Sequence, residues 1–259
     1  AENNHTVIKA NKQVDAKENQ NTMTKPNNVF TMNEVLLKEF YEVYLRPHEG
    51  EANLSFMVMV MARTKYYPTM VIKGGAKCLG RRVVRAEKLS ERSFLKALTF
   101  LELEASVAVD KDENPIPPEA CVYYISANRL DEKQAVYSHL QSLIDYTKKV
   151  ALSSESQTTP NLPNVSEEYM SCLAKSPKRD YLKLDVDTKD SEKLDVLRKL
   201  IREHNMTVQY AAETRGGYHV LLPVGQNMAP LINLAKKVTS ELGGAQHSWL
   251  TVESPSKNP

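Results

Sequence analysis

The sequence is poor in cysteine and contains no long apolar run. Its three cysteines, Cys78, Cys121 and Cys172, are an odd number, lie far apart and form no Cys-x-x-Cys pair. We therefore expect no disulfide framework and no cysteine-rich zinc site, but three reduced thiols in an intracellular, soluble protein whose compartment stays open. The longest uninterrupted apolar stretch covers 56–62. A helix needs roughly 20 apolar residues to span a bilayer, so no membrane association is predicted.

An excess of one charge sign is also missing, because 34 basic and 32 acidic residues leave a net charge of +2. Averaged over the chain, this balance does not indicate a nucleic-acid binder, whose footprint usually shows as a high domain pI. Counted by segment, however, residues 51–100 hold ten basic and three acidic residues, whereas residues 101–120 hold one basic and six acidic residues. This basic segment is either a solvated surface or a groove for a phosphate backbone.

Composition divides the 259 residues into four regions, and the length suffices for one large domain or two modules. We predict a disordered head over 1–30, an N-terminal α/β module over 31–150, a linker over 151–176 and a C-terminal module over 177–259. In the N-terminal module, the patterns predict helices over 33–46, 90–104 and 131–150 and strands over 55–62, 82–86 and 121–126. Whether the C-terminal module is complete at residue 259 stays open.

The C-terminal module alternates strand and helix patterns in the order βαββαβ. Strands are predicted over 181–187, 207–213, 218–224 and 247–253, and helices over 191–205 and 228–242. This order is the ferredoxin-like or RNA-recognition-motif-like arrangement, so the predicted fold class is α+β. We expect the first strand to lie between the third and the fourth, with both helices on one face. The other face is then open for a site or for the N-terminal module.

Alternation along three of these strands assigns a set of polar side chains to that open face, opposite the apolar residues that face the helices. The residues assigned to it are Lys183, Asp185, Asp187, Gly217, His219, Leu221, Trp249, Thr251 and Glu253. Two adjacent carboxylates repel each other unless a cation lies between them, and Mg²⁺ takes one or two carboxylates together with substrate phosphates. The set therefore favours metal-assisted phosphoryl transfer, with His219 as a phosphate contact.

Each member of the set also has a plain structural interpretation. An Asp-x-Asp at a strand end is often a solvated connection to a helix, and a lone outward His219 is often a surface residue. Trp249 is more typical of a packing residue than of a stacking platform. The run RGGYHVLL faintly matches the RNA-recognition motif, but that module needs aromatic side chains where Asp185 and His219 stand, so we reject it.

Taken together, the motifs resemble those of the archaeo-eukaryotic primase superfamily, the primase–polymerase group. LKLDVD (182–187) is similar to its first motif, and GYH within ETRGGYHVLL is similar to its second, small-x-His, motif. The third motif, a hydrophobic residue followed by Asp, would fall at LTVES, where the sequence has Glu253. RTKYYP and CVYYISANRLDEKQA are similar to the family's basic segment and its YI-x-x-N-P-R run, without the Pro between Asn128 and Arg129. The resemblance covers roughly residues 50–259.

This resemblance implies a metal-dependent nucleotidyltransferase of the primase–polymerase type, which primes or extends nucleic-acid strands from nucleoside triphosphates. Asp185, Asp187 and Glu253 would be catalytic and would hold Mg²⁺ or Mn²⁺. The implied nucleotide-binding residues are His219, Gly217, Arg215 and Arg129, and the implied nucleic-acid-binding residues are Arg63, Lys65, Arg81 and Arg82.

Two departures from the family keep an alternative open. A glutamate stands where the third aspartate is expected, and the zinc motif of many primases is missing from the sequence. In this alternative, the chain is a degenerate primase-fold subunit that binds nucleic acid or protein partners and has no catalytic activity. A cyclase or nuclease on a ferredoxin-like palm is a further alternative, and the sequence does not choose between DNA and RNA or between priming and extension.

Overall fold

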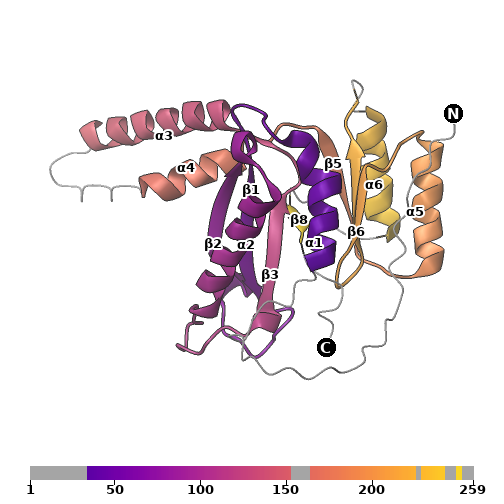
Figure 1. The fold of residues 1–259 in the computed structure, drawn as a ribbon, viewed down its shortest axis with the longest axis horizontal. Helices are drawn as coiled ribbons and strands as arrows, with labels where there is room; N and C mark the ends of the chain where they lie inside the picture. The colour runs from indigo at the N-terminus through magenta and orange to yellow at the C-terminus, as the bar shows by residue number, and fades with distance from the viewer. Residues whose placement is uncertain (1–33, 153–163, 226–228, 243–248, 253–259) are drawn as a thin grey trace.

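The computed structural model of the chain describes residues 34–152, 164–225, 229–242 and 249–252. These residues form two antiparallel sheets with helices packed against them, which is an α+β fold (Figure 1). The head predicted over 1–30 and residues 153–163 of the predicted linker lie outside the described residues. The rest of the linker prediction is wrong, because most of it is helical: α3 runs to Leu152, and α4 spans Val165–Ala174. One sheet belongs to the N-terminal part of the chain and the other to the C-terminal part, except that the last strand joins the N-terminal sheet.

The larger sheet has the strand order β2-β1-β3-β8, and the short strand β4 also pairs with β1. Its strands are β1 (Leu54–Arg63), β2 (Ala76–Arg85), β3 (Cys121–Ser126), β4 (Leu130–Asp131) and β8 (Trp249–Thr251). The strands predicted over 55–62 and 121–126 are confirmed, whereas the one predicted over 82–86 is the end of the longer β2. Among the described strands, β2 pairs with β1 alone and therefore forms an outer edge of the sheet.

One face of the larger sheet is covered by the N-terminal helix and by α2 (Glu91–Ser106). The N-terminal helix begins as α1 (Glu34–Phe40) and continues through a π-helical turn (Tyr41–Leu45) and a 3-10 turn (Arg46–His48). A capping box starts α2, because Ser90 and Ser93 each accept the other's backbone N–H through the side-chain oxygen. The buried side chains between these layers include Phe40, Tyr44, Phe56, Val58, Val60, Phe94, Leu98, Leu101 and Ile125.

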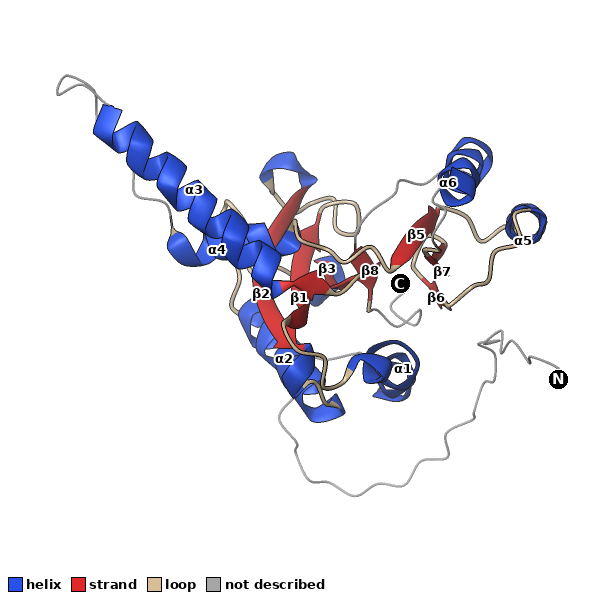
Figure 2. Cartoon of the chain, turned by 90° about the horizontal axis from the view of Figure 1, so that it is seen from above, coloured by secondary structure: helices blue, strands red, loops and turns tan. Residues whose placement is uncertain are grey.

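The other face of the larger sheet is partly covered by α3 (Glu132–Leu152) and α4 (Val165–Ala174). The two helices pack against each other, and α3 extends beyond the sheet (Figures 1 and 2). Met57, Leu130 and Leu173 are buried beneath them. No helix of the described part of the chain is long and apolar enough to cross a membrane. All three cysteines are free thiols, as predicted.

The smaller sheet has the order β5-β7-β6 and is covered on one face by two helices. Its elements are β5 (Tyr181–Val186), β6 (Tyr210–Glu213), β7 (Tyr218–Pro223), α5 (Ser191–Glu203) and α6 (Ala229–Leu242). The residues buried between sheet and helices are Leu184, Val186, Leu197, Leu200, Ile201, Val220, Leu222, Leu231, Leu234, Ala235, Val238 and Leu242. The predicted alternation is confirmed on β5 and β7, because their apolar residues at every second position face these helices.

The predicted place of the last strand is wrong. We expected it beside the first strand of the C-terminal module, but β8 pairs with β3, with Leu250 opposite Ile125 and Trp249 opposite Ser126. Leu250 and Val252 are buried in the core of the larger sheet, which explains the choice of partner. As a result, among the strands that the structure describes, β5 lies at an edge of a three-stranded sheet instead of in the middle of a four-stranded one.

The second face of the smaller sheet is covered by the N-terminal part of the chain. Leu221 is fully buried there, and Tyr181 and Tyr210 pack against the same core. The ring of Tyr210 lies 5.5 Å from that of Phe40 and 5.9 Å from that of Tyr44, between centroids. The face of the smaller sheet that carries Leu221 and Tyr181 therefore packs against the core of the N-terminal part.

Candidate functional site

Asp185 and His219 face each other across two neighbouring strands of the smaller sheet. They are directly opposite in the β5–β7 register, and His219 Nε2 lies 3.2 Å from Asp185 Oδ1. Lys183, two residues earlier on β5, places its Nζ 3.6 Å from Asp185 Oδ2. Each oxygen of the Asp185 carboxylate therefore has a nitrogen partner, and the three residues form one cluster, called below the Lys183–Asp185–His219 cluster.

This cluster is largely shielded from solvent. The side chain of Lys183 is 2% exposed, that of His219 7% and that of Asp185 16%. Burial lowers the pKa of Lys183, and the negative charge of Asp185 opposes that shift. The sequence pattern assigned Lys183 to this face without a role, and its position two residues before Asp185 was the available signal.

Asp187 follows the end of β5 and is exposed. Its position two residues after Asp185 continues the same strand face, and it lies close enough to Lys183 to act on the pKa of that side chain. The structure therefore places Asp185 and His219 side by side on the predicted face, with Asp187 directly after the end of β5. The three residues differ in exposure, because the side chains of His219 and Asp185 are 7% and 16% exposed whereas Asp187 is exposed.

Gly217 lets the turn before β7 pack directly on the backbone after β5. A Cβ atom at this position would lie 1.8 Å from the carbonyl oxygen of Val186 and 2.7 Å from the amide nitrogen of Thr188. Thr214 closes the turn, because its Oγ1 accepts the Gly217 N–H at 3.0 Å and its own N–H donates to Gly217 O at 2.8 Å. A close approach of two backbones therefore requires glycine here.

Replacing Gly217 by alanine is expected to lower the free energy of unfolding by about 2 kcal/mol, because the added methyl group meets backbone atoms that do not move aside easily. Urea unfolding followed by circular dichroism measures this loss. Gly216→Ala is the matched control, since a Cβ there has nothing within 4 Å. That variant should stay within about 0.5 kcal/mol of the wild type, and equal stability of the two variants would contradict the prediction.

Arg215 lies beside the larger sheet. Its guanidinium donates to the carbonyl oxygen of Glu119 at 2.8 Å and to that of Cys121 at 3.2 Å. It also lies over the ring of Tyr66, 4.2 Å from the centroid. The residue predicted to bind nucleotide therefore ties the turn before β7 to the start of β3.

Arg63 and Lys65 lie near the same tyrosine, at the end of β1. Arg63 Nη1 donates to the hydroxyl of Tyr124 at 2.8 Å. Lys65 is exposed, with its Nζ 4.7 Å from the centroid of the Tyr66 ring. Two of the four residues predicted to bind nucleic acid thus lie close to one another in the chain, beside Arg215.

Arg81 and Arg82 point to opposite faces of β2, as neighbours on a strand do. Arg81 pairs with Glu167 of α4. Arg82 donates to Glu104 of α2 at 2.5 Å. The four cations predicted to contact nucleic acid are therefore divided between the two faces of the larger sheet and do not form a single patch.

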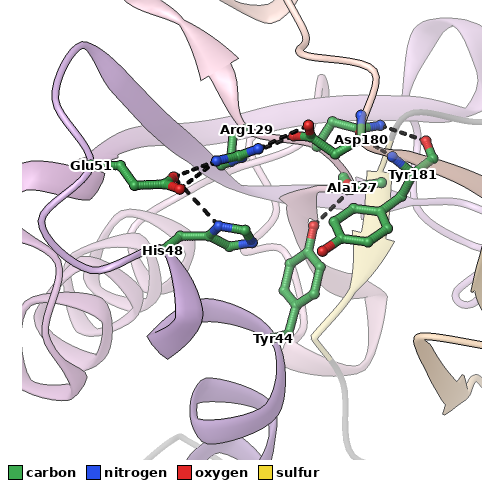
Figure 3. Close-up of polar contacts among 8 residues, drawn as sticks. Tyr44, His48, Glu51, Ala127, Arg129, Asp180 and Tyr181 are labelled. Carbon is green, nitrogen blue, oxygen red and sulfur yellow. Dashed lines mark hydrogen bonds and ion pairs between the residues drawn. The ribbon is translucent and has the colours of Figure 1, made fainter. Parts of the chain in front are cut away.

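Arg129 lies in a polar contact between the two parts of the chain (Figure 3). Its guanidinium donates to both oxygens of Glu51, at 2.5 and 2.6 Å, and to both oxygens of Asp180, at 2.9 and 2.8 Å. Burial acts to lower the pKa of Arg129, but these hydrogen bonds outweigh burial and the pKa is raised. His48 also lies in this contact, with Nδ1 3.4 Å from Glu51 Oε2. Sequence reasoning missed Glu51 and Asp180, whose partner is distant in the chain.

The residue before Arg129 bonds to the same segment through its amide. Asn128 Oδ1 accepts the backbone N–H of Asp180 at 2.9 Å and that of Tyr181 at 2.8 Å, and Asn128 Nδ2 donates to Tyr181 O at 3.0 Å. Tyr44 donates to the carbonyl oxygen of Ala127 at 2.7 Å, beside these bonds (Figure 3). The loop after β3 therefore holds the start of β5 in place.

Glu253, the predicted third carboxylate, lies outside the described residues. Within the described ranges, no group of three or more His, Cys, Asp or Glu side chains could hold a metal ion. Comparison of this chain with family models, curated proteins and solved structures finds no match in any of the three.

Proposed function

We propose that the protein is a metal-dependent nucleotidyltransferase of the primase–polymerase type, with its site on the smaller, β5-β7-β6 sheet. The observation that supports this most is the juxtaposition of Asp185 and His219 across β5 and β7, with Asp187 exposed at the end of β5. A 3′-hydroxyl oxygen would attack the α-phosphorus of a nucleoside triphosphate, forming a new P–O bond while pyrophosphate leaves.

The donor chemistry of Asp185 and Asp187 fits Mg²⁺ or Mn²⁺. Two carboxylates are the usual protein share of a Mg²⁺ site that phosphate oxygens complete. Such an ion, when bound, neutralises charge on the triphosphate and orients the attack. Asp187 is exposed and is therefore accessible to a triphosphate, whereas Asp185, two residues earlier on β5, is only 16% exposed.

In this proposal the remaining residues orient the substrate. His219 would donate a hydrogen bond to a phosphate oxygen, and the backbone at Gly217 would allow the triphosphate to approach the strand closely. Lys183 balances the charge of Asp185 while no substrate is bound. Arg129 is not needed for this role, because its guanidinium already joins Glu51 and Asp180.

Asp187→Asn is expected to reduce nucleotide incorporation at least roughly 100-fold, since it removes a carboxylate from the reacting centre. The assay measures extension of a labelled primer on a DNA template and on an RNA template, with Mg²⁺ or Mn²⁺. Asp187 is the sharper choice because it is exposed, whereas loss of Asp185 also disturbs Lys183.

The matched control is Asp195→Asn, which makes the same change on the exposed side of α5, where Asp195 pairs with Arg198 at 2.6 Å. It should retain wild-type incorporation. Wild-type nucleotide incorporation by Asp187→Asn with both Mg²⁺ and Mn²⁺ would contradict the proposal, provided that both variants unfold at the same urea concentration as the wild type.

The ion pair between Lys183 and Asp185 favours a second function. A buried ammonium that neutralises Asp185 in place of a metal ion suits a primase-fold subunit that has lost catalytic activity. Such a subunit retains binding to nucleic acid or protein partners. The two functions predict different results for the wild type. A non-catalytic subunit incorporates no nucleotide in either metal, and Asp187→Asn leaves its nucleic-acid affinity unchanged.

A further inference from the structure

A cleft of about 470 Å³ lies along the outer edge of the larger sheet, on elements that the proposed catalytic site does not use. Its walls are β2 with the turn that follows, the exposed side of α2, the first residue of α3 and the middle of α4. Residues lining it include Arg82, Arg85, Lys88, Lys96, Phe100 and Tyr169. Figure 2 shows β2 with α2 on one side and α4 on the other.

The cleft is positively charged. Two of its four cations have acidic partners, since Arg82 donates to Glu104 and Arg85 Nε lies 3.5 Å from Glu132. Lys88 and Lys96 are exposed. No ion pair found among the described residues includes either lysine, so their charges are available to an anionic ligand.

An aromatic ring lies among these cations. Phe100 is 45% exposed, although it is a large apolar side chain on a helix that buries Phe94, Leu98 and Leu101. The guanidinium carbon of Arg82 lies 5.8 Å from the centroid of its ring, and Lys96 Nζ lies 5.7 Å from it. An exposed ring with cations beside it can stack on a planar ligand whose phosphates the cations then neutralise.

We propose that this cleft binds single-stranded nucleic acid, with phosphates on Lys88 and Lys96 and a base stacked on Phe100. Cations that line a groove together with an exposed aromatic ring are the combination that single strands require. An acidic peptide would use the lysines but would draw nothing specific from the ring, and it is the competing occupant in the test below.

This site is separate from the Lys183–Asp185–His219 cluster. β2 and β5 belong to different sheets, and β8 lies at the opposite end of the larger sheet from β2. Figures 1 and 2 agree in placing β2 and β5 on opposite sides of β3. Binding at β2 therefore does not depend on metal or on nucleotidyl transfer, and the two proposals fail independently.

The test uses the full chain and a fluorescein-labelled oligothymidylate of about 12 nucleotides, with chelator present to remove divalent metal. Fluorescence anisotropy gives the dissociation constant across roughly 50 to 200 mM salt. Lys88→Gln combined with Lys96→Gln should weaken binding about tenfold and reduce the slope of log affinity against log salt by about 1.4, since each phosphate contact to a single strand contributes about 0.7.

Phe100→Ala should weaken binding about fivefold or more and leave the salt slope unchanged, because stacking involves no counterion release. The controls are Leu103→Ala, which removes another exposed apolar side chain of α2, and Lys193→Gln combined with Lys199→Gln, which makes the same charge change on α5. Both controls should bind as the wild type does.

Any of four outcomes would overturn the proposal. In the first, the wild type fails to bind the oligonucleotide. In the second, the Lys88 and Lys96 double variant binds no more weakly than its α5 control. In the third, the affinity of Phe100→Ala equals that of Leu103→Ala. Competition by a polyglutamate peptide as effective as that by unlabelled oligonucleotide would also overturn it and would assign the cleft to an acidic peptide.

Discussion

Asp185→Ala is expected to lower the free energy of unfolding by about 3 to 5 kcal/mol, because it leaves a buried charge without its partner. Lys183 is the charge in question, with a side chain only 2% exposed and Nζ 3.6 Å from Asp185 Oδ2. The contact of His219 with Asp185 is lost at the same time, since His219 Nε2 lies 3.2 Å from Asp185 Oδ1. Urea unfolding at neutral pH measures the effect.

A double-mutant cycle separates the ion pair from the other contacts of these side chains. Lys183→Met fills much of the same space without a charge, so the variant that combines it with Asp185→Ala should be more stable than Asp185→Ala alone. We expect a coupling free energy of about 2 kcal/mol. The control cycle uses Lys199 and Glu203, an exposed pair at 3.8 Å on α5, and its coupling should stay below about 0.5 kcal/mol. Equal coupling in the two cycles would show that burial adds nothing to the pair.

The stability of Asp185→Ala should also depend on pH in a defined direction. Burial lowers the pKa of Lys183, so the folded chain releases this proton at a lower pH than the unfolded chain does. Stability therefore rises with pH between the pKa of Lys183 in the folded chain and the ordinary pKa of lysine. Without Asp185 the pKa of Lys183 in the folded chain falls further. The loss in the free energy of unfolding of the variant, relative to the wild type, should therefore narrow as the pH rises from neutrality. A deficit that widens over this interval would contradict this account.

Local sequence patterns predicted which face the side chains of β5 and β7 take, although the bounds of some strands, such as β2, were wrong. Alternation on β5 and β7 put Leu184 and Leu222 against the helices and Asp185 with His219 on the other face, and both assignments are confirmed. These predictions succeeded because they depend on the period of the strand, which is a property of a few consecutive residues.

The partner of a strand is a different kind of property. Leu250 satisfies an alternating pattern equally well beside β5 or beside β3, and the larger core decided between them. Lys183 and Arg129 illustrate the same limit for charges. Each is neutralised by carboxylates whose proximity follows from the fold, and a sequence pattern for catalysis or binding says nothing about such an internal partner.

The segment-by-segment charge count had a structural meaning that the total of +2 concealed. Part of the basic segment forms β2, and strand alternation sends Arg81 and Arg82 to opposite faces, where each meets a glutamate. The lysines that follow β2 and lie on α2 are the ones whose charges are available, beside Phe100. A count of charges along the sequence located the basic region, and the strand and helix geometry then determined which of its cations have acidic partners.

Arg129→Met is expected to lower the free energy of unfolding by about 3 kcal/mol, because Arg129 joins the two parts of the chain. Its side chain is 16% exposed, and its guanidinium bonds to both oxygens of Glu51 and of Asp180. Without it, two carboxylates face each other with no cation between them. Arg129→Lys should recover less than half of the loss, because an ammonium is a point charge that cannot span two bidentate partners.

The exposed pair of Arg198 and Asp195, at 2.6 Å on α5, provides the control. Arg198→Met should change stability by less than about 0.5 kcal/mol. A second readout identifies the cause, because burial and then the charge of Arg129 lower the pKa of His48. In Arg129→Met the pKa of His48, measured by NMR, should therefore rise, and the part of the acid destabilisation that comes from His48 should shrink, since the folded and unfolded pKa values move closer together. Full recovery of stability by Arg129→Lys would show that the charge of Arg129, and not the shape of its guanidinium, holds the two sheets together.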